Sequence, residues 1–203
     1  MKRPHTLRDQ WFAAALTGPH GLRAAFKDAG HPLDAETIRI STGFPSRGAG
    51  RGNKQTIGQC WDQARIKDNI CQIYISPVLA DPLKVLGVLV HELAHAAVGC
   101  QHGHKAPFKR AATALGLTGP MTATTESPEL VARLAVLAER LGPYPHSALD
   151  LTGRKKQTTR MIKTECANGC GYIARLSRKA IDQHGAPICP SCMDQMTADI
   201  VNE

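Results

Sequence analysis

A segment near the middle of the chain constrains the fold more than any other feature. It opens with Asp81-Pro82, which is typical of a helix start, because Asp caps free backbone N–H groups and Pro suits the first helical position. Gly99 is well placed as the C-terminal stop. The sequence therefore predicts a helix over residues 82–98. Because residues 85–90 form an apolar run, the rest of the chain must bury this helix.

The predicted helix carries the sequence His91-Glu92-Leu93-Ala94-His95. Residues four apart lie on one face of a helix, so the two histidines can direct their imidazoles at one point. Zinc accepts imidazole nitrogen and keeps an open position in catalytic sites, where Glu92 can take a proton from water. This His-Glu-x-x-His pattern is typical of zincins. It predicts His91 and His95 as zinc ligands and Glu92 as the catalytic base.

A five-residue pattern also arises by chance, so its surroundings matter. The apolar run before it indicates that the helix is buried. Buried imidazoles and a buried carboxylate need a metal ion or hydrogen bonds to offset the loss of water. This context favours a metal site over a chance match.

The third zinc ligand must come from residues after this helix. A metzincin pattern requires Gly at position 98 and His at position 101, but the chain has Val98 and Gln101, which excludes that class. A gluzincin would use a downstream acid. Glu126 and Glu129 are the weaker candidates for that role, because they follow a loop rich in Pro and Thr.

Two histidines just after the predicted helix are the stronger candidates. His102 and His104 follow the predicted stop at Gly99, where a tight turn can bring the chain back to the zinc. Their positions alone do not choose between them.

The order of these residues resembles the SprT-like metallopeptidase family, which includes the Spartan proteases. The similarity rests on His91-Glu92-Leu93-Ala94-His95-Ala96, followed by Gly103-His104 and then Phe108. In that family a Gly-His-Gly-Pro-x-Phe type of segment follows the helix motif, and its histidine completes the zinc site. The resemblance therefore implies that His104 is the third ligand and that Phe108 has the packing role. The chain departs from the family in having Lys105-Ala106-Pro107 in place of Gly-Pro-x.

Segments before the metal helix are also similar to the family. Residues 58–61 and 73–77 look like its strands, and the resemblance spans residues 5–140. It implies a zinc metalloendopeptidase that cleaves DNA-associated or DNA-crosslinked proteins and is recruited through DNA. In the implied mechanism zinc holds a water, and Glu92 takes its proton and returns it to the leaving amine.

The expected fold class is α+β, with a zincin-like metal helix, a small antiparallel three-stranded sheet and a following zinc-ribbon module. Three strands in a row favour antiparallel pairing. The expected strands are residues 37–44, 56–61 and 70–76, and the expected helices are 6–17, 21–29, 82–98, 107–115 and 128–141. The expected domains are an SprT-like metallopeptidase domain over 1–143, a linker over 144–157 and a zinc ribbon over 158–203.

The C-terminal tail carries two pairs of cysteines. Cys166 and Cys170 form one pair and Cys189 and Cys192 the other, and four thiolates at this spacing suit one tetrahedral structural zinc. Four free thiols in a packed tail are the weaker interpretation, because the tail is too short to bury much core unaided. His184 is an alternative ligand. The sequence therefore predicts two zinc ions, one catalytic and one structural.

The balance of charge favours a polyanionic partner. The net charge is +8 at pH 7, and the loop from Arg47 to Lys54 carries only positive charges. Aromatic residues make up 4% of the chain, which argues against a surface on which bases stack. The first half of the tail is also basic, with Glu165 opposed by Arg154, Lys155, Lys156, Arg160, Lys163, Arg175, Arg178 and Lys179. DNA is the expected partner, and a merely solvated basic face is the alternative.

No secretory signal or membrane-spanning run is visible, since the apolar stretches fall well below the roughly 20 residues that a span needs. Seven cysteines, four of them in a metal pattern, favour a reducing cytosol over disulfides. We therefore expect a cytoplasmic monomer without a membrane partner. Cys60, Cys71 and Cys100 are interpreted as buried thiols, and Cys100 is also a remote candidate ligand.

Two other functions compete with peptide hydrolysis. The first is a non-catalytic, zinc-containing nucleic-acid-binding or transcription-associated protein, in which a fourth protein ligand fills the open position of the zinc. The second is a metal-dependent hydrolase of another bond, such as a nuclease.

Overall fold

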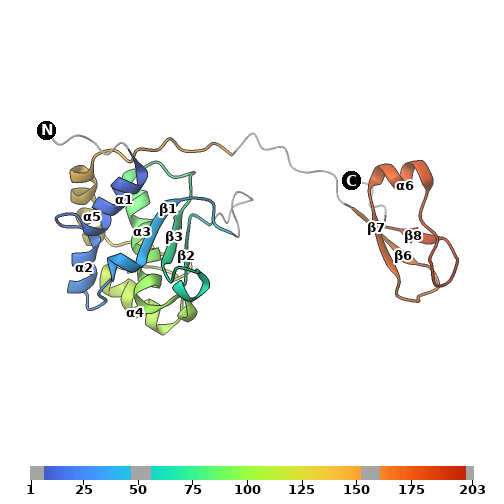
Figure 1. Ribbon diagram of the computed structural model, residues 1–203, viewed down its shortest axis with the longest axis horizontal. Helices are drawn as coiled ribbons and strands as arrows, with labels where there is room; N and C mark the ends of the chain where they lie inside the picture. Colours follow the sequence, from blue (N-terminus) through green and yellow to red (C-terminus); the bar gives the residue numbers. More distant parts are fainter. Residues whose placement is uncertain (1–6, 47–55, 152–160, 200–203) are drawn as a thin grey trace. The chain divides into compact units, whose positions relative to one another are not determined.

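The computed structural model describes residues 7–46, 56–151 and 161–199. The chain divides into two compact units, residues 1–152 and 153–203, each with its own core (Figure 1). The first unit holds the predicted metal helix, and the second holds the paired cysteines. Helices and small sheets are mixed in the described parts of both units, in agreement with the expected α+β class.

The helices of the first unit lie close to their predicted positions. They are α1 (Arg8–Thr17), α2 (Leu22–Asp28), α3 (Pro82–Val98), α4 (Ala106–Leu115) and α5 (Pro128–Leu141), with short 3-10 turns η1 (Ala35–Thr37), η2 (Gln63–Arg65) and η3 (Cys100–His102). Helix α3 begins and ends where predicted. An Asp81 carboxylate oxygen accepts the Lys84 N–H at 2.8 Å, and Gly99 ends the helix with a φ of 90°.

The sheet of the first unit corrects the predicted pairing. It contains β1 (Ile38–Thr42), β2 (Gly58–Trp61) and β3 (Cys71–Ile75) in the order β1-β3-β2. Strand β2 pairs with β3 antiparallel, but β1 pairs with β3 in parallel, so the expected all-antiparallel sheet was wrong. Ile73 and Ile75 are fully buried, and a strand with buried faces gains most from the central position. The half-buried β2 is therefore left at the edge.

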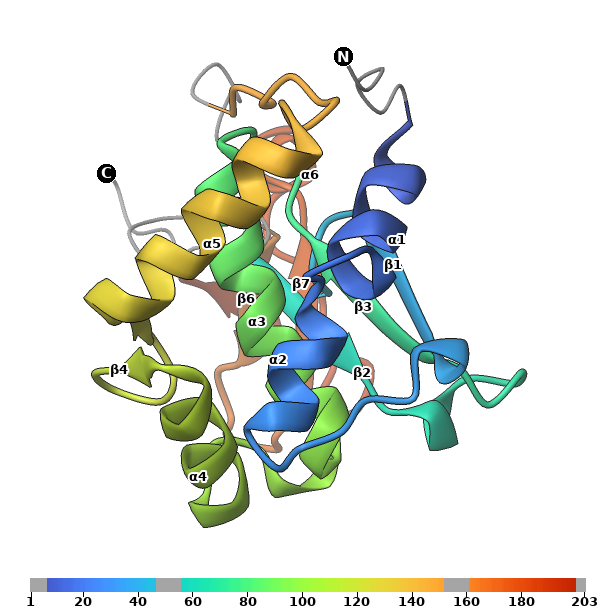
Figure 2. The same ribbon diagram turned by 90° about the vertical axis from the view of Figure 1, so that its left-hand side faces the viewer.

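Helix α3 is the centre of the core of the first unit. Val85, Leu86, Leu89 and Leu93 are fully buried. The helix contacts β2, β3, α4 and α5, and Figure 2 shows α5 beside it. Packing from several elements fixes the rotation of α3, and with it the directions in which its last two turns present their side chains.

The expected linker opens with a residue that packs into the first unit. Tyr144, its first expected residue, is buried, with its ring centroid 5.0 Å from that of Trp11 and 5.5 Å from that of Phe12. The hydroxyl groups of Tyr144 and Thr42 lie 2.6 Å apart. Burying the Tyr144 ring, with a partner for its hydroxyl, outweighs the conformational entropy that this segment loses when it is ordered. Tyr144 therefore belongs to the first unit.

A two-stranded hairpin between α4 and α5 was not predicted. Strands β4 (Leu117–Thr118) and β5 (Thr125–Glu126) pair antiparallel. Strands of two residues are too short for alternating hydrophobicity to show in a sequence. The hairpin loop places Thr124 beside α3.

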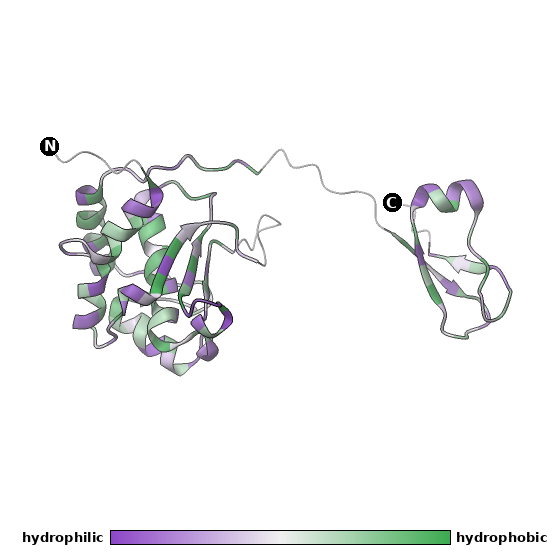
Figure 3. Cartoon of the chain, in the orientation of Figure 1, coloured by the Kyte–Doolittle hydropathy of each residue, from purple (hydrophilic) through white to green (hydrophobic). Residues whose placement is uncertain are grey.

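The second unit is a small sheet with one helix. It contains β6 (Ile162–Cys166), β7 (Ile173–Leu176), α6 (Arg178–His184) and β8 (Met196–Ala198), and its sheet has the antiparallel order β7-β6-β8. Helix α6 is mostly hydrophilic in Figure 3 and buries Ile181. The main buried cluster is Cys166, Cys189 and Met196. So small a core gives little hydrophobic stabilisation, and the unit needs a further source of stability.

Candidate metal centres

Three histidines of the first unit converge on one point. His91 and His95 come from consecutive turns of α3, and His104 comes from the turn before α4. The Nε2 atoms of His91 and His104 lie 3.3 Å apart, and those of His95 and His104 lie 3.2 Å apart. One ring nitrogen from each of the three lies within 4.8 Å of the others, so the group could hold a metal ion.

The spacing of these nitrogens fits a tetrahedral zinc site. Zn–N bonds of about 2.0–2.1 Å place two ligands of a regular tetrahedron about 3.3–3.4 Å apart. The two observed separations match that value closely. Three imidazoles fill three corners, which is the donor set of catalytic zinc sites, whereas structural sites use four protein ligands.

Two glycines explain why His104, and not His102, joins the group. Gly99 has a φ of 90° and Gly103 a φ of 49°, a region that glycine enters without a steric penalty. They flank η3 and turn the chain back toward α3. His102 lies within η3 and is not a member of the group that the described residues form.

The pKa values of the three histidines are lowered, chiefly by burial. The pKa of His91 falls to about 4, with His104 contributing, and that of His95 falls to about 3, with both other histidines contributing. The more exposed His104 has its pKa lowered by the same desolvation. At neutral pH all three imidazoles are therefore uncharged, which is the form that binds a metal.

Two side chains hold these rings in place. The Thr124 hydroxyl oxygen lies 2.9 Å from Nδ1 of His91. Phe108, fully buried on α4, stacks on His95 with ring centroids 4.1 Å apart and meets His104 edge-on at 5.0 Å. Phe108 was expected from the resemblance, but no sequence signal singled out Thr124.

Glu92 follows His91 in α3, and its carboxylate is held by the edge strand β2. Its carboxylate accepts the backbone N–H of Cys60 and lies against Gly58, where an added Cβ would be 2.5 Å from Oε1. Burial raises the pKa of Glu92 to about 8, and Cys100 adds to this rise. The carboxylate is not a member of the three-histidine group, as suits an acid that is not itself a ligand.

The other proposed ligands lie elsewhere. An Oε1 atom of Glu126 lies against Gly87, one turn before His91, and Glu129 is exposed in the first turn of α5. Neither acid, nor Cys100, belongs to a metal-binding group among the described residues.

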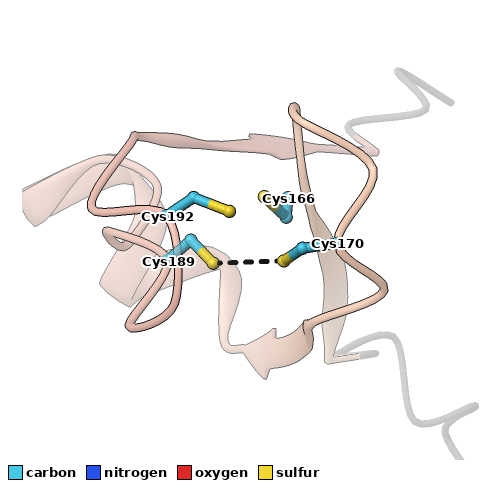
Figure 4. Close-up of side chains that lie close together, drawn as sticks. All are labelled: Cys166, Cys170, Cys189 and Cys192. Carbon is cyan, nitrogen blue, oxygen red and sulfur yellow. Dashed lines mark hydrogen bonds between the residues drawn. The ribbon is translucent and has the colours of Figure 1, made fainter.

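The four cysteines of the second unit also converge. Cys166 ends β6, Cys170 follows it, and Cys189 and Cys192 lie in the segment before β8 (Figure 4). The Sγ atoms of Cys170 and Cys189 are 3.5 Å apart, and all four Sγ atoms lie within 4.8 Å of one another. Zn–S bonds of about 2.3 Å separate tetrahedral thiolates by about 3.8 Å, so the group could hold one zinc ion. His184 is not a member of this group.

The predicted basic surfaces fall only partly within the described residues. The loop from Arg47 to Lys54 lies outside them, as do residues 154–156 and 160. Lys163 and Arg175 are cross-strand partners on β6 and β7, and Arg178 begins α6. In the described ranges no helix has both the length and the apolar character that crossing a membrane requires.

The scan against protein-family models and the searches of curated proteins and of solved structures each found no match. The chemistry open to the chain therefore follows from the geometry of its two candidate metal centres.

Proposed function

We propose that this protein is a zinc-dependent endopeptidase of the SprT-like type, with a catalytic zinc at His91, His95 and His104. The observation that carries the proposal is the convergence of three neutral imidazoles at tetrahedral spacing, with the buried acid Glu92 next to His91 on α3. Three protein ligands leave the open position that catalysis needs. A zincin-like fold for the first unit and a zinc ribbon for the second are parts of the same proposal.

A zinc ion bound there supplies a Lewis acid that polarises a peptide carbonyl and lowers the pKa of water. Glu92 is the general base that takes a proton from the attacking water and gives it to the leaving amine. The backbone N–H of Cys60 holds the carboxylate of Glu92 in place, and burial makes that carboxylate more basic. Thr124 and Phe108 position the imidazoles rather than react.

The proposed substrates are proteins bound or crosslinked to DNA, and DNA brings the enzyme to them. The net charge of +8 supports binding to phosphates. Lys163 and Arg175 lie directly opposite each other on β6 and β7, so they share one face of the second unit, on which Lys163 also forms an ion pair with Glu165. That face is where we place the contact with DNA.

The test compares the wild type with Glu92→Gln on casein and on a DNA-bound protein, with and without DNA. We expect the wild type to cleave protein and DNA to stimulate it. Glu92→Gln should lose about 10²–10⁴-fold in rate, the usual contribution of a general base, while it keeps both zinc ions and its affinity for DNA. The matched control Glu129→Gln, an exposed acid on α5, should keep full activity.

Undiminished cleavage by Glu92→Gln contradicts the assignment of the base. A wild type that cleaves no protein even with DNA present, yet holds both zinc ions, contradicts the enzyme and favours a non-catalytic nucleic-acid-binding protein. Labelled DNA is incubated in parallel, because its cleavage in place of protein identifies a nuclease.

A further inference from the structure

Three thiols that neither metal centre uses meet beneath the end of α3. Cys60 lies on β2, Cys71 on β3 and Cys100 in η3. The Cys60 Sγ is 3.3 Å from the Cys71 Sγ and 3.2 Å from the Cys100 Sγ. Cys60 is therefore in contact with both other thiols, although Cys100 is 40 residues away in the chain.

The distances do not suit a third zinc site. Tetrahedral zinc thiolates lie about 3.8 Å apart, and the two separations around Cys60 are clearly shorter. The three thiols also do not form one of the metal-binding groups that the described residues contain. Sulfur atoms in such close contact are instead placed for reaction with each other.

Two of the thiols are open to a cavity. A cavity of about 370 Å³ is lined by Cys71 and Cys100, together with η2 and Gln101. Cys60 is not among its described lining residues. A small molecule in the cavity can thus reach the Cys100 sulfur directly. The Cys60 sulfur is in contact with that of Cys100.

The thiols differ in acidity. Hydrogen bonding with Cys60 and Cys71 lowers the pKa of Cys100, which favours its thiolate form. The pKa of Cys60 is raised by its hydrogen bonding to Cys100 and Cys71 and by burial, so it keeps its proton. A thiolate is the nucleophilic form of cysteine.

We propose that Cys100 and Cys60 are an oxidisable pair in which Cys100 reacts with a hydroperoxide and Cys60 closes the disulfide. The Cys100 sulfur attacks one peroxide oxygen, the O–O bond breaks, and the other oxygen leaves and is protonated. The Cys60 sulfur then attacks the resulting sulfenic acid, the S–O bond breaks, and water leaves with the Cys60 proton. Two thiols are oxidised to one disulfide, and hydrogen peroxide is reduced to two waters. This chemistry is independent of the proposed hydrolysis.

The test treats the full-length, zinc-loaded protein with hydrogen peroxide, blocks the remaining thiols and digests it with trypsin without reduction. Trypsin separates the three thiols, because its cleavage sites divide them among residues 55–65, 68–84 and 85–105. We expect the peptide containing Cys60 to be joined to the one containing Cys100, with loss of two hydrogens. A link from Cys60 to Cys71, or no link, overturns the proposal.

Two variants test the order of events. In Cys60→Ser the link is lost and Cys100 is labelled by a 1,3-dione that traps sulfenic acid. Cys71→Ser, the matched control, keeps the link between Cys60 and Cys100. Label on Cys71 instead of Cys100 overturns the proposal. So does a third zinc ion per wild-type chain that Cys60→Ser lacks, because a metal would hold these sulfurs as ligands.

Discussion

The Nδ1 atom of His91 lies 2.9 Å from the hydroxyl oxygen of Thr124, which is 33 residues further along the chain. With a metal ion bound to Nε2, which faces His104, Nδ1 of His91 would carry the hydrogen and donate it to the hydroxyl. The contact would then fix the rotation of the His91 ring. Through it the short β4–β5 hairpin contributes to the candidate metal centre.

Replacing Thr124 by Ala should weaken zinc binding at the histidine centre by about 10–100-fold, as is usual when such an outer partner is lost. The cysteine centre should bind as before. A chelator competition on each centre measures both affinities. Thr122→Ala, an exposed residue in the same hairpin loop, is the control and should change neither. Equal affinities for Thr124→Ala and the wild type would show that the contact does not orient His91.

Gly58 is expected to be essential for the position of Glu92. A Cβ there would lie 2.5 Å from Oε1 of Glu92 and 2.6 Å from a methyl of Val88, and a buried carboxylate has little room to move. Gly58→Ala should therefore reduce peptidase activity by at least about tenfold, because a misplaced catalytic group commonly costs that much. Zinc content should stay unchanged. Normal activity in Gly58→Ala would show that the carboxylate does not act from this place.

The sequence predicts the parts of the metal centre that are local and misses those that depend on tertiary contacts. His91 and His95 follow from helical spacing, whereas the choice of His104 over His102 depends on two positive-φ glycines around η3. Thr124 could not be found, because its partner is brought to it by folding. The resemblance to a known family was the one signal that favoured His104.

The sheet shows a similar limit. Alternating residues located β1 and β3, and β2 was also expected near its place, but nothing in the sequence indicated that β3 would lie between the other two strands. Strand order follows from which strand can bury both faces, and that depends on the helices that cover the sheet. The parallel pairing of β1 with β3 is the consequence.

The metal-free protein should lose stability as the pH falls below 6.5. The folded state lowers the pKa of His91 from 6.5 to about 4 and that of His95 from 6.5 to about 3, so in this window the unfolded chain binds more protons. Each histidine contributes at most about 1.4 kcal/mol per pH unit. The measurement is the difference in unfolding free energy between the wild type and a His91→Gln, His95→Gln double variant. From pH 7 to pH 5 the wild type should lose more unfolding free energy than the double variant. An equal loss in both proteins would contradict the prediction.

Glu92 should have the opposite effect on how the stability of the metal-free protein depends on pH. Its pKa is raised from 4.5 to about 8, so between these values the folded state binds more protons and stability falls as the pH rises. Glu92→Gln removes this loss and should stabilise the metal-free protein at pH 8 by about 1–3 kcal/mol, the usual cost of an ill-solvated buried group. Thermal unfolding at pH 5 and pH 8 measures it, and a variant that is less stable at pH 8 would rule it out.

Removing one cysteine ligand should unfold the second unit alone. Its apolar core is small, and zinc binding to four thiolates is the main stabilising contribution that we assign to it. Cys170→Ser should therefore lose one zinc ion and the hydrogen-exchange protection of β6, β7 and β8. The first unit should keep its protection. Ser191→Ala, an exposed neighbour between two ligands, is the control. Full protection of the sheet in Cys170→Ser would mean that zinc does not hold this unit together.

Metal analysis of the wild type and of His95→Ala tests the central claim most directly, since every step of the proposed hydrolysis depends on zinc at the three imidazoles. The account predicts two zinc ions per wild-type chain and one in His95→Ala, with the remaining ion at the four cysteines. A wild type with one zinc ion or none, or a His95→Ala variant that keeps both ions, would contradict it.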